Sequence, residues 1–370
     1  METSQDTPEE LELTPDEELA LLEPEPDALP VTYSGQDFDV EGLVRRMGKG
    51  DILVPIFGHS SELIETEGFQ RSFVWRRPQM DRFIESLLLG YPIPGIFFVK
   101  QSDNRYLVLD GQQRLRTLQY YYAGIHLGRE FALTNVSEEF KDLTYKSLPE
   151  TLRRRLDNTF FQATIVAIDA TKSSLEAVYQ IFERLNSGGT ALTPHEIRVA
   201  LYAGPFIDFL ERLNGDESWR ELYGKRSPRL RDQEIILRAM ALYTDATKYR
   251  RPLKSFLNDF VGSRRAVEHD ATEGLEVKFR KAAQLVAAAS GRNALRPQGS
   301  QVNAALTEAI FVGLMRRLGS DPTPDEAAVR AAIDRIHSNE SLVVAVSRAT
   351  ADEDAVRTRL EAATTAFAGA

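Results

Sequence analysis

Residues 106–118 read YLVLDGQQRLRTL, and this stretch determines the architecture of the N-terminal half of the 370-residue chain. Its first four residues are apolar and predict a buried strand. The strand meets Asp110 and Gly111, and a helix is predicted to begin at once with Gln112. A strand that turns directly into a helix exposes the first backbone N–H groups of that helix. Together with the helix dipole, these donors favour a bound phosphate or another anion.

The side chains of this turn suit phosphate chemistry. Gly111 lets the backbone approach a ligand closely, and Asp110 could hold a metal ion, orient a water molecule or act as a base. Gln112 and Gln113 offer amide donors and acceptors for phosphate oxygens. Arg114 offers a planar, permanently charged fork that could neutralise a phosphoryl group. The alternative is an ordinary strand–turn–helix with a capping Asp and solvated Gln and Arg side chains.

Three further segments accompany the DGQQR box. They are Val54 and Pro55 with FQRSFVW at 69–75, FERLNSGGTALT at 182–193, and RLRDQEIILR at 229–238. With the box, they resemble the IP…QR-x-x-W, F-x-x-[IL]-N-x-x-G-x-x-L-[ST] and R-x-x-D-x-E-x-x-LR segments of the GmrSD-type restriction-endonuclease N-terminal domain family. That family is related to the ParB/sulfiredoxin-like fold. The resemblance covers roughly residues 40–260, with the segments in the expected order.

The resemblance implies nucleotide binding or hydrolysis at residues 110–114. It adds Gln70 and Arg71 as nucleotide ligands, with Arg71 beside Asp110, and Asn186 as a further ligand contact. The family's restriction enzymes pair this domain with an H-N-H nuclease module, in the same chain or in a partner. The C-terminal third here is Ala- and Arg-rich and lacks an H-N-H array. The resemblance therefore supports nucleotide handling rather than DNA cleavage by this chain.

The composition excludes several kinds of site. Apolar residues make up 42% of the chain, as expected for a globular protein, and there is no cysteine. Disulfides, thiolate metal sites and the cysteine chemistry of sulfiredoxins are therefore ruled out. No apolar run approaches the ~20 residues that span a bilayer, and the acidic N-terminus is unlike a signal peptide. We expect a cytoplasmic protein without membrane association.

Charge is distributed unevenly along the chain. Residues 1–30 contain eleven Asp or Glu, five Pro and no Lys or Arg. Fourteen of the 55 acidic residues precede Arg45, the first basic residue, which leaves 41 acidic against 45 basic residues. We expect residues 1–35 to be a disordered acidic leader. A sharper alternative is a nucleic-acid mimic that masks the basic body or docks a partner.

Apolar periodicity and turn residues predict two folded domains, an α/β domain over residues 36–170 and a helical domain over 171–370. The fold class is thus α+β, with a small ParB/sulfiredoxin-like domain before a mainly α-helical half. Capping boxes at Ser173 and Thr193 open two of the helices. The expected strands are 52–54, 96–99, 106–109 and 161–168. The other expected helices are 38–47, 78–90, 112–124, 205–214, 232–245, 252–261, 269–290, 302–318, 325–338 and 352–368.

Other polar residues have simpler interpretations. His195 lies inside the Thr193–Glu196 capping box without a second ligand at helical spacing, so we expect no metal site there. Asp81 and Glu85, four residues apart on a predicted helix, are expected to be solvated. Trp75 is expected to pack rather than stack on a base. The basic runs at 153–155, 229–231 and 248–251 could contact nucleic acid but fit a charged surface equally well.

These observations lead to three hypotheses. The first is a nucleotide-binding and NTP-hydrolysing protein of a bacterial anti-phage system, with an NTP on residues 110–114 and Mg²⁺ or an attacking water at Asp110. It would couple nucleotide state to DNA or to a separate nuclease effector. The second is a metal-dependent DNA nuclease acting at Asp110. The third is a non-catalytic nucleotide switch or a ParB-like DNA clamp. The sequence does not separate the first hypothesis from the third.

Overall fold

The computed structural model describes residues 31–54, 75–101, 103–167, 172–185, 192–265, 269–296, 301–320 and 323–370. It contains two compact units, one over Asp27–Ala191 and the other over Leu192–Ala370. The boundary lies later than the predicted one after residue 170, because α7 (Lys172–Leu185) packs against β4 (Tyr106–Asp110) of the first unit. The predicted acidic leader lies almost entirely outside the described residues.

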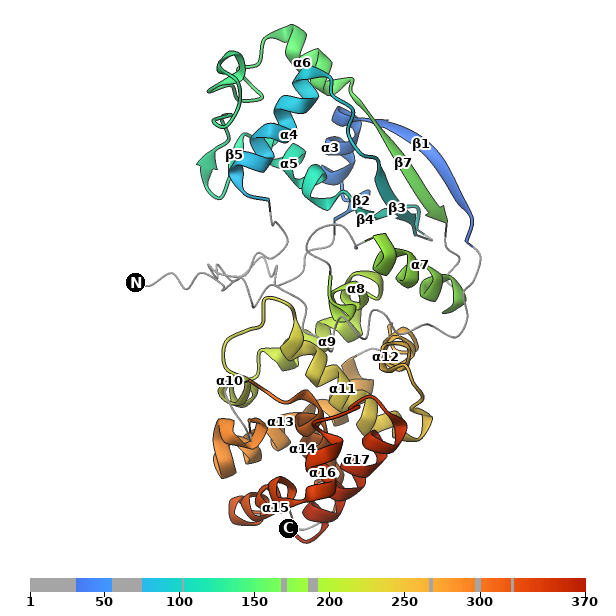
Figure 1. The fold of residues 1–370 in the computed structure, drawn as a ribbon, viewed down its shortest axis with the longest axis vertical. Helices are drawn as coiled ribbons and strands as arrows, with labels where there is room; N and C mark the ends of the chain where they lie inside the picture. Colours follow the sequence, from blue (N-terminus) through green and yellow to red (C-terminus); the bar gives the residue numbers. More distant parts are fainter. Residues whose placement is uncertain are drawn as a thin grey trace. The chain divides into compact units, whose positions relative to one another are not determined.

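The first unit contains a five-stranded sheet in the order β1-β7-β3-β4-β2 (Figure 1). Its pairings, from β1 to β2, are antiparallel, parallel, antiparallel and parallel. Strands β3 and β4 are consecutive in the chain and form the predicted hairpin. The strands are β1 (Tyr33–Asp39), β2 (Ile52–Leu53), β3 (Ile96–Lys100), β4 and β7 (Phe160–Ala167), and a separate small hairpin is formed by β5 (Ile125–His126) and β6 (Arg129–Glu130).

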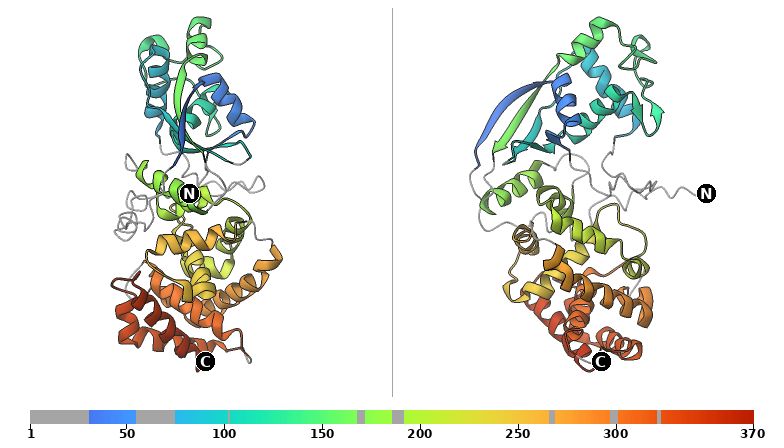
Figure 2. Two further views of the ribbon diagram at one scale, coloured as in Figure 1. Left: turned by 90° about the vertical axis from the view of Figure 1, so that its right-hand side faces the viewer. Right: turned by 180° about the vertical axis from the view of Figure 1, so that it is seen from behind.

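Helices of the first unit pack against the sheet through one continuous apolar core, which includes Leu43, Ile84, Phe98, Leu115 and Phe161. Figure 2 shows these helices on the concave side of the long β1–β7 ribbon. The helices are α3 (Val40–Gly48), α4 (Arg77–Leu89), α5 (Gln112–Ala123) and α6 (Glu150–Asp157), together with the 3-10 turn η1 (Glu138–Phe140).

Two helix ends follow directly from the sequence. Gly90 ends α4 with φ 78°, and Gly124 ends α5 with φ 74°, as the glycine positions predict. The predicted helix over 38–47 starts later, because Asp39 is its N-cap and accepts a hydrogen bond of 2.6 Å from the Gly42 N–H. Phe38 belongs instead to β1, a strand that the sequence did not predict.

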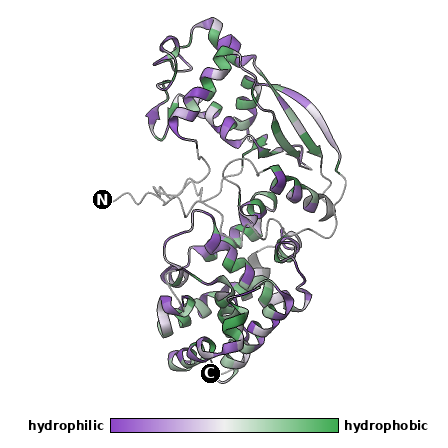
Figure 3. Ribbon diagram, viewed as in Figure 1, coloured by the Kyte–Doolittle hydropathy of each residue, from purple (hydrophilic) through white to green (hydrophobic). Residues whose placement is uncertain are grey.

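The second unit is built of helices, which confirms the predicted fold class of a small α/β region followed by a mainly helical half. Figure 3 shows polar and apolar residues alternating round most of these helices. The unit comprises α8 (Pro194–Leu201), α9 (Pro205–Asn214), α10 (Glu217–Tyr223), α11 (Arg231–Asp245), η2 (Ala246–Lys248), α12 (Leu253–Gly262), α13 (His269–Ser290), η3 (Gly291–Leu295), α14 (Ala304–Arg317), α15 (Glu326–Ser338), α16 (Glu340–Ala345) and α17 (Glu353–Ala368).

Helix α14 is the centre of the second unit. Its residues from Ala305 to Met315 are all buried, as expected for a helix surrounded by others. Gly313 allows α17 to approach closely, since a Cβ there would lie 2.9 Å from the Ala363 carbonyl carbon. Phe311 stacks on Phe279 of α13 with ring centroids 4.9 Å apart. No helix among the described residues is long and apolar enough to cross a membrane.

Candidate functional site

The turn between β4 and α5 requires glycine for two reasons. Gly111 has φ +97°, a left-handed conformation that costs other residues about 1–2 kcal/mol. A Cβ at this position would also lie 3.2 Å from Ile96 Cγ1, which belongs to the neighbouring strand β3. The Gly111 carbonyl accepts the first α5 hydrogen bond, from the Leu115 N–H at 3.0 Å. The strand thus turns into a helix within one residue, as the sequence predicts.

Asp110 lies at the last position of β4, next to an irregularity in the sheet. It pairs with Phe97, but the register between β3 and β4 shifts between Phe97 and Phe98. Such shifts are common beside functional sites because they turn a side chain away from its regular direction. The Asp110 side chain is 47% exposed at this edge. It is therefore accessible to a ligand, although it sits at the end of a buried strand.

Arg114 holds this turn together. Its Nη2 donates to Asp110 Oδ2 at 2.6 Å, and its Nη1 donates to the carbonyl oxygens of Pro94 and Gly95, the latter at 2.9 Å. The side chain is only 11% exposed. Burial lowers the pKa of Arg114 and the Asp110 charge raises it, but arginine remains charged in any case. Arg114 therefore ties the end of β4 and the start of β3 to α5.

The N-terminus of α5 suits an anion. No side chain caps it, and its first turn contains no acidic residue. Gln112 takes its first position and is half-buried. An uncapped helix start attracts negative charge through its N–H groups and dipole. The carboxylate that precedes it, Asp110, is already paired with Arg114.

Helix α5 also holds Trp75 and Val54 through side-chain hydrogen bonds. The Gln113 side-chain oxygen accepts from the Trp75 N–H at 3.2 Å, and Arg116 Nη2 donates to the Val54 carbonyl at 3.2 Å. Arg116 thus points away from the partners of Arg114, as expected for residues about 200° apart round a helix. The Trp75 ring packs on Phe83 with centroids 5.4 Å apart. Trp75 is therefore a packing residue, which confirms that prediction.

Three predicted ligand residues, Gln70, Arg71 and Asn186, lie outside the described residues, and their roles stay predictions. Among the residues that the structure does describe, no group of three or more His, Asp or Glu is arranged to hold a metal ion. Mg²⁺ in proteins commonly has one or two carboxylate ligands and completes its coordination shell with water and substrate phosphates. Asp110 fits such an ion as a single carboxylate ligand.

The prediction that Asp81 is solvated is wrong. Asp81 is fully buried, pairs with Arg77 Nε at 2.7 Å, and accepts hydrogen bonds from the backbone and side chains of Thr134 and Asn135. Burial raises its pKa, but hydrogen bonds from Asn135, Arg77 and Thr134 outweigh that effect and lower it overall. Glu85 accepts from the Ser137 N–H at 2.7 Å. The two carboxylates anchor the loop that follows β6.

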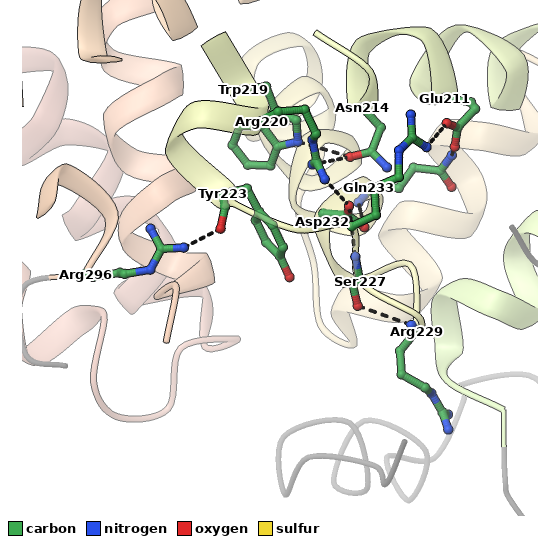
Figure 4. Close-up of polar contacts among 11 residues, drawn as sticks. Glu211, Asn214, Trp219, Arg220, Tyr223, Ser227, Arg229, Asp232, Gln233 and Arg296 are labelled. Carbon is green, nitrogen blue, oxygen red and sulfur yellow. Dashed lines mark hydrogen bonds and ion pairs between the residues drawn. The ribbon is translucent and has the colours of Figure 1, made fainter. Parts of the chain in front are cut away.

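A second polar cluster lies in the helical unit and contains the segment that resembles R-x-x-D-x-E-x-x-LR. Its Arg229 pairs with Glu196 at 3.1 Å, and both are buried. The buried Asp232 accepts from Arg220 at 2.9 Å and from the Ser227 N–H at 3.2 Å (Figure 4). This motif therefore stabilises the helical unit, and the sequence alone gave no sign of these partners.

The Thr193 capping box is confirmed. The Thr193 N–H donates to Glu196 Oε2 at 2.7 Å, and the Glu196 N–H donates to Thr193 Oγ1 at 3.1 Å. His195 contacts Gln233 and Arg198, and neither of these side chains is a usual metal ligand. Its surroundings are those of a buried structural histidine.

Several cations of the basic runs have intramolecular partners. Arg154 pairs with Glu150, and Arg155 donates to the Leu88 carbonyl at 2.9 Å. Lys248 pairs with Asp245 at 2.8 Å. These partners favour the charged-surface interpretation for these three residues over direct nucleic-acid contact.

Comparison with known proteins gives one family match, over most of the first unit and the start of the second. Residues 53–203 match the model of the family described as GmrSD restriction endonuclease, N-terminal domain. The match includes the DGQQR box and confirms the resemblance drawn from the motifs. A comparison with curated proteins gave no match.

Proposed function

Because residues 53–203 carry the N-terminal domain of the GmrSD restriction endonuclease family, we propose that this protein binds and hydrolyses a nucleoside triphosphate within a bacterial restriction-like anti-phage system. The nucleotide phosphates bind at the N-terminus of α5, and the helical unit couples nucleotide state to DNA or to a separate nuclease effector. The observation that carries this proposal is that the uncapped N-terminus of α5 directly follows Asp110, whose carboxylate is half-exposed.

Asp110 is the catalytic residue in this proposal. Its Oδ2 is engaged by Arg114, whereas Oδ1 has no hydrogen-bond partner within the described part of the chain. A carboxylate with one oxygen fixed and the other exposed can orient an attacking water or serve as a Mg²⁺ ligand. Bound Mg²⁺ supplies charge neutralisation for the phosphoryl oxygens.

Arg114 acts as a positioning residue rather than as an open phosphate clamp. Its guanidinium is largely buried and bonded to Asp110 and to the carbonyls of Pro94 and Gly95. These bonds fix the direction of the Asp110 carboxylate relative to the helix start. The family resemblance supplies Gln70, Arg71 and Asn186 as the further nucleotide contacts, with Gln112 and Gln113 beside the phosphates.

The two other hypotheses predict different outcomes. A metal-dependent nuclease at Asp110 would need several clustered carboxylates or histidines, and none is arranged in this way among the described residues. A non-catalytic switch uses the same helix start for binding but shows no turnover. One observation favours the non-catalytic switch. The Arg114 guanidinium is bonded within the protein, so it is not available to neutralise charge on a phosphoryl group in the transition state.

The test is phosphate release from each of the four NTPs with Mg²⁺, using the full chain. Asp110→Ala should lower turnover at least about 100-fold, because a positioned base or water-orienting group contributes about 10²–10⁴. Asp103→Ala is a matched control, because Asp103 is also 47% exposed and pairs with Arg105 at 2.7 Å, at the other end of β4. Equal turnover in all three proteins would reject Asp110 as catalytic.

Arg114 needs its own readout, because a buried arginine also affects folding. Arg114→Gln should lower kcat with little change in KM, measured on protein shown to be folded by circular dichroism. Arg114→Lys, which keeps the charge, should recover part of kcat. An unchanged kcat in folded Arg114→Gln would reduce Arg114 to a purely structural role.

A further inference from the structure

Arg198 of α8 is buried in the helical unit without a charged partner. Its side chain is completely buried, and its bonded neighbours are His195 and Asn258. No ion pair joins Arg198 to an acidic residue among the described residues, although buried guanidinium groups elsewhere in this unit, such as Arg359 with Glu308 at 2.6 Å, have one. A buried charge is costly unless an opposite charge accompanies it.

The hydrogen bonds show that both neighbours of Arg198 are neutral. His195 Nε2 lies 2.9 Å from the side-chain oxygen of Gln233, so Nε2 carries the proton. His195 Nδ1 is then the acceptor for Arg198 Nη1, at 3.2 Å. Burial, reinforced by the Arg198 charge, lowers the pKa of His195 to about 3, so the ring stays neutral. Asn258 accepts from Arg198 Nε at 2.9 Å through its amide oxygen.

Two donors beside this contact are unused. Arg198 Nη2 and Asn258 Nδ2 are both buried and have no hydrogen-bond partner in the described structure. In a planar guanidinium, Nη2–H points along the same edge as Nε–H, which already meets Asn258. Nη2 is bonded to the same carbon as Nε, and Nδ2 to the same carbon as Oδ1, so both unused donors flank one Arg198–Asn258 contact. The buried Ser255 Oγ, three residues earlier on α12 and on the same face as Asn258, also lacks a partner.

We propose that the helical unit holds a small oxyanion, of the phosphate or sulfate type, between Arg198 Nη2 and Asn258 Nδ2. The anion supplies the negative charge that Arg198 lacks and acceptors for the unused donors. Asp259 follows Asn258 but lies about 100° round the helix from it. All residues of this anion site belong to the second unit, so a negative result here leaves the proposed NTPase site unaffected.

Asn258→Asp tests the proposal, because it places a carboxylate oxygen where Nδ2 lies and leaves the other oxygen on Arg198 Nε. The introduced carboxylate supplies the negative charge itself and can accept two hydrogen bonds from Arg198. The melting temperature of the full chain is measured with inorganic phosphate, sodium sulfate, or chloride at matched ionic strength. Wild type should gain about 2 °C or more in phosphate or sulfate over chloride. Asn258→Asp should melt higher than wild type in chloride and lose most of that gain.

Asn214→Asp is the matched control. Asn214 is also buried and accepts from an arginine, Arg220 Nη2 at 2.7 Å, but Arg220 already pairs with Asp232. This variant should not melt higher than wild type in chloride, and it should keep the full response to phosphate. The general stabilising effect of phosphate and sulfate on folded proteins is the same in all three proteins.

Arg198→Met provides a second variant, which removes the charge and replaces the guanidinium with a shorter, flexible and unbranched apolar side chain. It should remain folded and should show no specific response to phosphate or sulfate. Equal anion responses in wild type, Asn258→Asp and Arg198→Met would overturn the proposal. So would a wild type whose melting temperature is the same in all three salts.

Discussion

Asp110 and Arg114 form an ion pair of 2.6 Å that closes the turn between β4 and α5. The two residues are one helical turn apart, with Gly111 between them in a left-handed conformation. The same guanidinium binds the carbonyls that precede β3. In the DGQQR box, the Asp110–Arg114 pair, the Gln113 amide and Gly111 therefore each have a separate structural role.

The first prediction concerns Gly111. Gly111→Ala should destabilise the protein by about 2–4 kcal/mol, because the positive φ and the contact with Ile96 both oppose a Cβ. Gly124→Ala is the control, since Gly124 also has positive φ but a Cβ there meets nothing within 4 Å. It should cost only about 1–2 kcal/mol. Urea unfolding measures both, and equal losses would show that the Ile96 contact is unimportant.

The second prediction concerns Asp81. Asp81→Ala should cost about 3–5 kcal/mol, because it removes the buried carboxylate that pairs with the partly buried Arg77 and leaves several donors of Thr134 and Asn135 unpaired. Glu85→Ala should cost about 1 kcal/mol, since Glu85 holds only exposed Ser137 bonds. Chemical unfolding with hydrogen exchange of the loop after β6 measures the effect. A loss in Asp81→Ala no larger than in Glu85→Ala would contradict the assignment of Asp81 as the loop's main anchor.

The third prediction is a pH dependence from Glu211. Burial raises its pKa to about 7, with Arg226 opposing and Asp232 adding to the shift. The folded state therefore holds a proton that the unfolded state, with the ordinary value of 4.5, releases. This contribution to stability is fully present below about pH 4.5 and is lost as pH rises to about 7, at up to about 1.4 kcal/mol per pH unit.

Glu211→Gln should remove that dependence while preserving the shape of the side chain. The stability of the variant relative to wild type should therefore rise between pH 5 and pH 8. Unfolding in urea at several pH values gives both curves. Parallel curves for the two proteins would show that Glu211 keeps an ordinary pKa in the folded state.

Local signals account for the parts of the fold that the sequence predicted. The β4–α5 turn follows from an apolar run and a glycine, and the ends of α4 and α5 follow from Gly90 and Gly124. Strand β1 could not be predicted in this way, because YSGQDFD is polar and mostly exposed. Its extended form depends on pairing with β7, more than a hundred residues later in the chain.

The candidate site was likewise only partly predictable from the sequence. The sequence identified Asp110 and Gly111 at the turn, because both lie within the motif itself. It could not show that Arg114 binds Pro94 and Gly95, or that Asp81 is enclosed by Asn135, since these partners come from other segments. Charged residues look alike in a sequence whether they are solvated or buried. Long-range contacts decide between the two.

The most direct test of the central claim measures binding and turnover of the same NTP in Asp110→Asn. The amide keeps the shape of the carboxylate but cannot act as a base or bind Mg²⁺ strongly. We expect the Kd to change only a few-fold while phosphate release falls at least about 100-fold, with Asp103→Asn unchanged in both. Turnover at the wild-type rate in Asp110→Asn, with the same nucleotide bound, would contradict the assignment of the DGQQR box as an NTP-hydrolysing site.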